Sequence, residues 1–132
     1  MISQDVALLE AVYAAWNEGD IDGMLQRIDP DIEWRPGTDS PFPGMHAGRA
    51  GFERYVRSWA DMFERVHIDL GEIRSAGDWL MSEQRQRSRL PDSAADLEAV
   101  VTHVWRVRDG KIDRWFSFRD EDEACAFLGL DA

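Results

Sequence analysis

Apolar residues in the first half of the chain recur every three or four positions, which is the spacing of one helix face. Residues 3–18 show this spacing, with Ser3 placed as the N-cap of the predicted helix. Residues 21–28 repeat it over a shorter stretch, which Asp20 caps and Pro30 ends. The pattern therefore predicts two consecutive helices at the start of the chain.

A third helical stripe follows later, over residues 52–63. Before it, residues 32–35 predict a short strand, and residues 36–48 are rich in proline and glycine, which predicts a loop. The first half of the chain is thus mainly helical.

The second half has the composition of β-strands. Four segments are rich in β-branched and aromatic residues or are bounded by turn residues: 67–75, 79–90, 97–108 and 111–118. Asp109-Gly110 favours a tight primed turn between the last two, and residues 121–128 predict a closing helix. This order predicts an α+β domain whose helices pack on one face of a bent sheet.

Length and charge restrict the classes of protein. The 132 residues fit one domain, 1–132, and the 15 basic and 26 acidic residues give a net charge of −11. An acidic chain without a basic stripe is not expected to bind nucleic acid, and no apolar run reaches the roughly 20 residues of a membrane span. The lone Cys125 excludes an internal disulfide and suits a reducing compartment, so we expect a cytoplasmic protein.

Four segments of the chain resemble SnoaL-like proteins of the nuclear transport factor 2-like superfamily: YAAWNEGD at 13–20, DPDIEW at 29–34, HVWRVRDGKI at 103–112 and EACAFLGL at 123–130. The resemblance implies a cone, in which a curved antiparallel sheet wraps around the N-terminal helices and encloses a pocket. It also implies a homodimer joined across the outer sheet face. The superfamily contains isomerases, epoxide hydrolases, polyketide cyclases, dehydratases and non-catalytic binding proteins, so the fold does not determine the function.

Two catalytic patterns of the superfamily are incomplete in this chain. The tyrosine of the ketosteroid isomerases falls on Val12, and their base falls on Arg35 or Pro36. The epoxide-hydrolase arginine falls on Arg85, but one of the two acids falls on Arg87. Neither reaction is expected by its known mechanism.

Both alignments place Glu83, Arg85 and Arg87 on the pocket side of their strand. The epoxide-hydrolase alignment also places Trp115 and Ser117 inward, with Asp113 in register. We therefore expect the two arginines to hold an acidic group of a ligand and Glu83 to orient them. The alternative is that this polar strand faces water and that Glu83 and Arg85 form a surface pair.

Other candidate residues lie on the predicted helices and strands and in the loop before residue 49. His46 is the candidate proton carrier, or else an exposed loop histidine. His103 is expected on the outer face of the sheet. Aromatic residues are candidates for the pocket wall, or else for the core: Tyr13, Trp16, Trp34, Tyr55, Trp59 and Trp115. No histidines or cysteines have metal-ligand spacing, so neither a metal nor a cofactor is expected.

These observations predict a protein that binds a small hydrophobic molecule carrying a polar or acidic group. Cofactor-free acid–base turnover, of the cyclase, isomerase or hydrolase type, is an extension of this hypothesis, with His46, Glu83 and Arg85 as the catalytic candidates. Two alternatives are a non-catalytic interaction module of the same fold and an interior packed solid with aromatic residues. A cavity of several hundred Å³ would favour the ligand-binding hypothesis.

Overall fold

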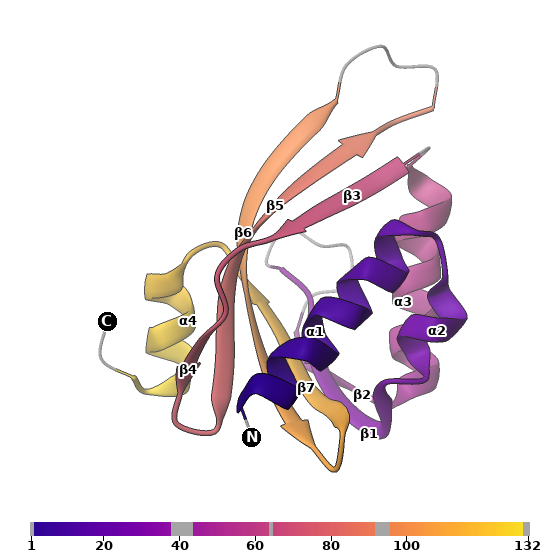
Figure 1. Ribbon diagram of the computed structural model, residues 1–132. Coiled ribbons are helices and arrows are strands. Elements are labelled where there is room, and N and C mark those ends of the chain that lie inside the picture. Colours follow the sequence, from indigo (N-terminus) through magenta and orange to yellow (C-terminus); the bar gives the residue numbers. More distant parts are fainter. Residues whose placement is uncertain (1, 38–43, 64, 92–95, 131–132) are drawn as a thin grey trace.

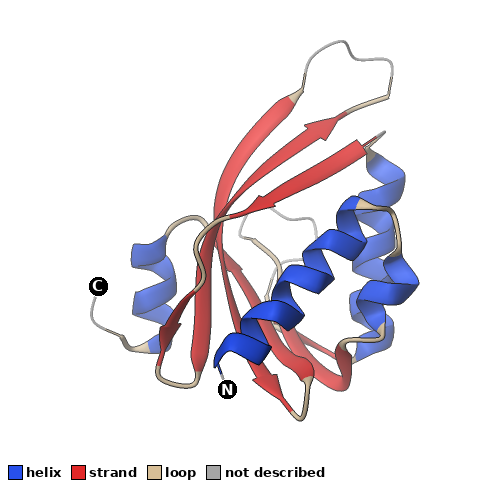
Figure 2. Cartoon of the chain, viewed as in Figure 1, coloured by secondary structure: helices blue, strands red, loops and turns tan. Residues whose placement is uncertain are grey.

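A strongly curved sheet wraps around three helices in the computed structural model, which describes residues 2–37, 44–63, 65–91 and 96–130. The helices on the concave face are α1 (Ile2–Asn17), α2 (Ile21–Leu25) and α3 (Arg49–Met62). Helix α4 (Glu121–Leu128) packs on the opposite face, as Figures 1 and 2 show. The fold is the α+β cone that the sequence predicts.

The sheet has seven strands. They are β1 (Ile28–Arg35), β2 (His46–Ala47), β3 (Arg65–Leu70), β4 (Arg74–Ala76), β5 (Trp79–Arg89), β6 (Leu97–Arg108) and β7 (Lys111–Phe118). Their order is β2-β1-β7-β6-β5-β3, with β4 paired to the other end of β5. All pairs are antiparallel except β1 with β7, which is parallel. The sheet is therefore mixed, whereas the expectation was a wholly antiparallel sheet.

The first helices differ from the prediction at their ends. Helix α1 begins at Ile2, so Ser3 lies inside it and does not cap it. Asp20 does cap α2, because its carboxylate accepts a hydrogen bond from the backbone N–H of Gly23 at 2.9 Å. Helix α2 ends early, and Ile28 is the first residue of β1. Pro30 lies in β1 where the ladder to β7 is interrupted, so its missing N–H removes no sheet hydrogen bond.

The predicted strand 67–75 is divided into β3 and β4 by a close approach at Gly71. The Gly71 N–H donates to the carbonyl oxygen of Glu83, and a Cβ at this position would collide with that oxygen. The predicted turn is confirmed, because Asp109 and Gly110 both have positive φ between β6 and β7. The predicted closing helix is α4, and Asp120 caps it by accepting a hydrogen bond from the backbone N–H of Glu123.

Two apolar clusters hold the layers together. The larger lies between the concave face of the sheet and the helices; its members with no exposed surface are Leu9, Val12, Ile28, Ile32, Trp105 and Ile112. The smaller lies beneath α4 and contains Met81, Val104, Phe116, Phe118 and Ala124. Both faces of the central strands are therefore buried near α4, whereas only the concave face is covered further along the sheet.

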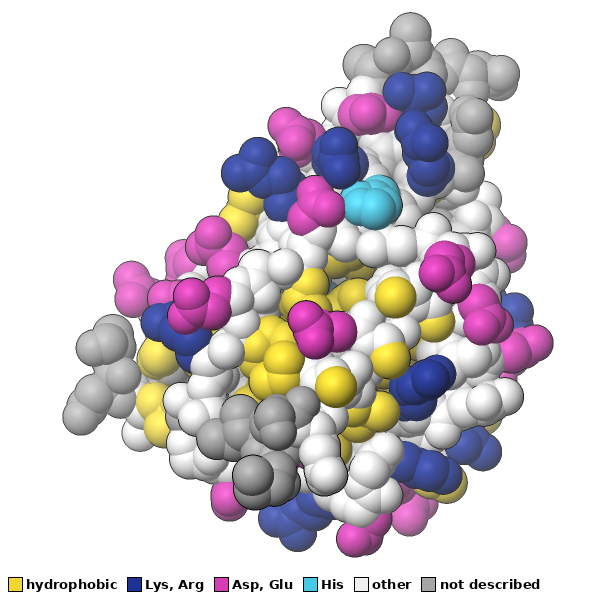
Figure 3. Space-filling model, viewed as in Figure 1, with side chains coloured by type: hydrophobic (Ala, Val, Ile, Leu, Met, Phe, Trp, Pro, Cys, Tyr) yellow, Lys and Arg dark blue, Asp and Glu magenta, His cyan; other side chains and the backbone are white. Residues whose placement is uncertain are grey.

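A shallow hollow of about 430 Å³ lies outside the larger cluster, between α1 and β3. Figure 3 shows apolar side chains gathered in the middle of this side of the molecule, with charged side chains around them. Within the described residues, no helix has both the length and the apolar character that crossing a bilayer requires.

Candidate functional site

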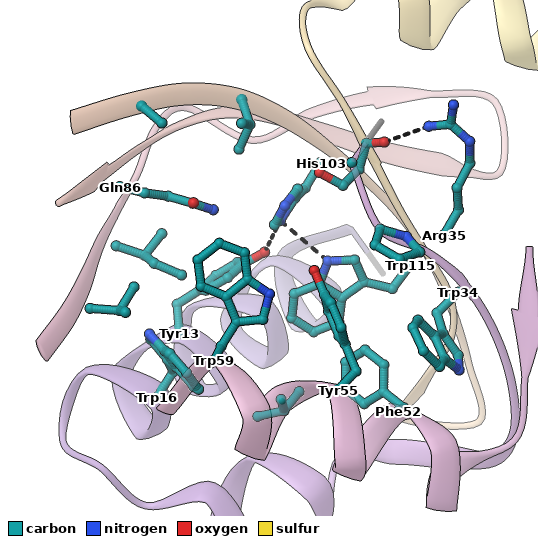
Figure 4. Close-up of a pocket in the computed structure, with 18 of the residues that line it drawn as sticks. Tyr13, Trp16, Trp34, Arg35, Phe52, Tyr55, Trp59, Gln86, His103 and Trp115 are labelled. Carbon is teal, nitrogen blue, oxygen red and sulfur yellow. Dashed lines mark hydrogen bonds between the residues drawn. The ribbon is translucent and has the colours of Figure 1, made fainter. Parts of the chain in front are cut away.

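A cavity of about 390 Å³ lies between the concave sheet face and helices α1 and α3. Figure 4 shows its aromatic walls and the few polar groups among them. The predicted aromatic residues Tyr13, Trp16, Trp34, Tyr55, Trp59 and Trp115 all line it, as does Ser117. The interior is therefore not packed solid, and the role of these side chains as ligand contacts stays a prediction.

The aromatic rings of α3 and β1 form one continuous stack. The Trp34 ring lies parallel to the Tyr55 ring, with centroids 5.1 Å apart, and Phe52 meets Trp34 edge-on at 5.8 Å. His46 stacks on the other side of Trp34 at 4.4 Å and is not among the residues that line the cavity. The position of His46 therefore does not support the predicted role as a proton carrier inside the pocket.

The predicted orientation of Glu83, Arg85 and Arg87 is wrong. All three side chains are exposed on the outer face of β5, where Arg87 pairs with Asp69 at 3.2 Å. The inner face of the same strand presents Gln84 and Gln86 instead. Because strand side chains alternate between faces, an alignment error of one residue inverts the whole set.

Asp113 also points away from the cavity. The register of β6 and β7 shifts here, since Arg106 faces Arg114 while the next residue, Val107, faces Ile112. Asp113 lies in this irregularity, and its carboxylate accepts two hydrogen bonds from the Arg106 guanidinium, at 2.7 and 3.0 Å. The prediction of Asp113 as a ligand contact is wrong, because the bulge turns it to the outer face.

His103 lines the cavity, whereas the sequence predicted it on the outer face. It pairs with Ser117 of β7 and with Ser82 of β5, so it shares the inner face with Ser117. The residue is 7% exposed and lies among the rings of Tyr13, Trp105 and Trp115. The prediction failed because residues 102–105 are all buried, so burial does not distinguish the two faces there.

A hydrogen-bond network fixes the tautomer of His103. The Trp115 indole N–H, which can only donate, points at His103 Nδ1 at 3.2 Å. Nδ1 is therefore an acceptor, and it also accepts the Tyr13 hydroxyl proton at 2.7 Å. The Gln84 amide N–H in turn donates to the Tyr13 oxygen at 2.7 Å. The ring proton of neutral His103 consequently lies on Nε2.

Burial determines the protonation of both members of this pair. Removal from water lowers the pKa of His103 to about 3, because the charged imidazolium loses its hydration. Burial likewise raises the pKa of Tyr13 well above its usual value, and the hydrogen bond from Gln84 only partly opposes this rise. At neutral pH His103 is uncharged and Tyr13 keeps its proton.

The Nε2–H group of His103 is an available donor. No hydrogen bond to this nitrogen is formed within the part of the chain that the structure describes, although both partners of Nδ1 are in place. A ligand oxygen in the cavity could accept a hydrogen bond from this N–H. The sequence analysis did not place His103 and Gln86 at the cavity, because the sequence does not determine the register of the central strands.

Charged side chains are scarce around the cavity. Among the described residues that line it, Arg35 and Arg119 are the only charged ones. Arg35 donates to the Ser117 carbonyl oxygen at 2.6 Å and lies over the Phe118 ring, while Arg119 interacts with Glu123. No Asp or Glu lines the cavity within the described residues, so no carboxylate there can serve as a base. Those residues also contain no group of three potential metal ligands.

The fold is an α+β cone with an interior cavity. The chain belongs to the SnoaL-like family: the model of the SnoaL-like domain matches residues 9–115. No protein with a curated function matches the chain.

Solved structures share the fold at low sequence identity. TerC, co-crystallised with polyporic acid, has a TM-score of 0.75, is 22% identical and matches over 96% of this chain and 97% of its own. A putative polyketide cyclase from Xanthomonas campestris pv. campestris has a TM-score of 0.72 at 23% identity, over 94% and 96% of the two chains. A protein from Catenulispora acidiphila with a ketosteroid isomerase-like fold, in complex with trimethylamine, has a TM-score of 0.73 at 17% identity, over 94% and 93%.

Proposed function

We propose that this protein binds a small, flat, mostly apolar molecule in the cavity and that His103 Nε2–H donates a hydrogen bond to an oxygen of that ligand. The observation that carries the proposal is the tautomer inferred for His103, whose Nε2–H has no partner within the described residues. A carbonyl or ether oxygen would match this donor. The hydrophobic body of the ligand would contact the surrounding rings.

Size and lining support a ligand built from one or two rings. A volume of about 390 Å³ lies in the usual range of small-molecule sites. Trp34 and Tyr55 stack on each other in the cavity wall, and elsewhere in the wall Trp115 meets the Tyr13 ring edge-on. Such surfaces favour flat aromatic partners, which gain roughly 0.5–1.5 kcal/mol per ring pair beyond their burial. The polyporic acid bound by TerC, which shares the fold, is consistent with a ligand of this kind.

Binding has more support here than acid–base turnover. His103 cannot accept a proton in the tautomer inferred from its contacts, because Nδ1 faces two donors and Nε2 carries the ring proton. Tyr13 is a donor to His103 and holds its proton firmly. The site can polarise a ligand oxygen, but the described residues around it supply no group poised to remove a proton.

We also propose that the protein is a homodimer and that it is cytoplasmic. A homodimer through the outer face of β5 and β6 would cover Val100, which is 49% exposed there, and would bring Glu83 and Arg85 of the two copies into reach. Sedimentation is expected to show a species of twice 15.1 kDa; a species of 15.1 kDa alone at micromolar concentration would exclude the dimer. The lone Cys125 fits a reducing cytoplasm.

Binding can be tested with two matched probes, naphthalene and 2-acetylnaphthalene. The intrinsic fluorescence of the cavity tryptophans should be quenched saturably by both, and the ketone should bind roughly 3- to 10-fold more tightly because it accepts one hydrogen bond. His103→Leu should remove this ratio, whereas Arg85→Ala, on the outer face of β5, should preserve it. Absence of saturable binding of either probe to the wild-type protein would refute the proposal.

A further inference from the structure

Gln86 is a second polar group on the cavity wall without a partner. It lies on the inner face of β5, and Figure 4 shows its side chain extending into the cavity on the side of His103. No hydrogen bond to its amide is formed within the described residues. Gln84, two positions earlier on the same face, differs in that its amide is committed to the Tyr13 hydroxyl.

The surroundings of Gln86 are apolar. It pairs with Ile68 on β3 and with Ala99 on β6, and Val66 and Val101 line the cavity on either side of them. A primary amide in such a wall is unfavourable unless water or a ligand satisfies it. Gln86 is half-buried, so water can reach its amide, and a polar group of a ligand in the cavity could take the place of that water.

The sheet register sets the separation between Gln86 and His103. Ala99, the β6 partner of Gln86, lies four residues before His103 on the same strand and the same face. At about 3.3 Å per residue, the two backbone positions are roughly 13 Å apart along the strand. Both side chains extend inward from the concave face, so a ligand that reaches both would be elongated, with its two polar groups on opposite edges.

We propose that Gln86 determines the specificity of the cavity for flat molecules with two polar functions on opposite edges, an acceptor oxygen held by His103 and a hydroxyl or carbonyl held by Gln86. Hydroxyaryl ketones are the simplest class with this arrangement. A glutamine amide can donate and accept, so it can bind a hydroxyl in either sense. This inference rests on the proposed function, because it assigns the second end of the ligand in the same site.

The test adds one hydroxyl to the ketone probe. 6-Hydroxy-2-acetylnaphthalene should bind the wild-type protein roughly 3- to 10-fold more tightly than 2-acetylnaphthalene, the gain of one net hydrogen bond. In Gln86→Leu this gain should vanish while 2-acetylnaphthalene still binds as in the wild type. Arg85→Ala is the matched control, since it alters the neighbouring residue on the opposite face and should keep the full gain. Calorimetric titration measures all six combinations.

The outcomes separate this inference from the proposed function. An equal hydroxyl gain in the wild type and Gln86→Leu, or no gain in the wild type, would overturn the role of Gln86 while leaving ketone binding intact. No binding of either ketone to the wild type would refute the proposed function itself. The affinity of Gln86→Leu for 2-acetylnaphthalene reports whether that variant folds, and Gln86→Met replaces it if it does not.

Discussion

The two faces of strand β5 carry polar residues in similar numbers but in opposite environments. Glu83, Arg85 and Arg87 face water, where ion pairs contribute little because both partners remain solvated. Gln84, on the inner face, is 1% exposed and joins the network that ends at His103. The comparison shows that polarity alone does not mark a site. What distinguishes Gln84 is that it has lost water and that its amide N–H depends on a specific partner, the Tyr13 hydroxyl.

The largest expected difference between the inner and outer faces of the sheet is the dependence of folding stability on pH, which His103 should cause. Its pKa is about 3 in the folded protein and about 6.5 when unfolded, so the unfolded state binds the extra proton between these values. Folding stability should therefore fall with decreasing pH, by up to about 1.4 kcal/mol per pH unit below 6.5. Urea denaturation at pH 6.5 and 4.5 should show an excess loss of about 2–3 kcal/mol in the wild type over His103→Leu. Identical losses would contradict a buried neutral imidazole; Arg85→Ala should follow the wild type.

Asp113→Asn tests whether the burial of a polar side chain, and not the sheet face on which it lies, determines its contribution to the free energy of unfolding. Asp113 is on the outer side but is only 8% exposed, and it accepts two hydrogen bonds from Arg106. Loss of its charge should destabilise the protein by about 2 kcal/mol, measured by urea denaturation, without changing the affinity for 2-acetylnaphthalene. A change in affinity with unchanged stability would show that Asp113 contacts the ligand, and would contradict its outward orientation.

Tyr13→Phe removes one hydroxyl from the inner network. Gln84 then loses its acceptor and His103 Nδ1 loses one of its two donors, which should lower the free energy of unfolding by about 1–2 kcal/mol. The same denaturation experiment measures this. A variant as stable as the wild type would show that the network contributes nothing to folding.

The smallest effect is expected on the exposed face. Arg85→Ala and Arg87→Ala should each change the free energy of unfolding by less than about 0.5 kcal/mol, since both side chains are solvated. Both variants should also bind 2-acetylnaphthalene with unchanged affinity. A loss of ligand affinity in either one would mean that the orientation of β5 described here is reversed.

Features governed by neighbouring residues could be predicted from the sequence. The Asp109-Gly110 turn, the cap at Asp20 and the aromatic stripe of α3 depend on short-range geometry, and the structure has all three. The aromatic cavity wall was predictable for the same reason, because the stripe shows which helix face turns toward the sheet.

Features governed by strand register could not be predicted. Residues 82–89 are polar on both faces, so their alternation carries no hydrophobic contrast, and residues 102–105 are buried on both faces because α4 covers the outer one. In each segment the sequence pattern does not distinguish two registers that differ by one residue. The wrong register was chosen, so Arg85 and His103 were each assigned to the wrong face of the sheet. The parallel pairing of β1 with β7 depends on residues far apart in sequence, and no local pattern indicates it.

The central claim is that neutral His103 offers its Nε2–H to a ligand oxygen, and nitrogen-15 NMR of histidine-labelled protein tests it most directly. With His103→Leu used for assignment, the account predicts a protonated Nε2 and an unprotonated Nδ1 at pH 7. It further predicts a downfield shift of the Nε2 proton on addition of 2-acetylnaphthalene, larger than with naphthalene. A proton on Nδ1, or a bound ketone that leaves the Nε2 proton resonance unmoved, would contradict it.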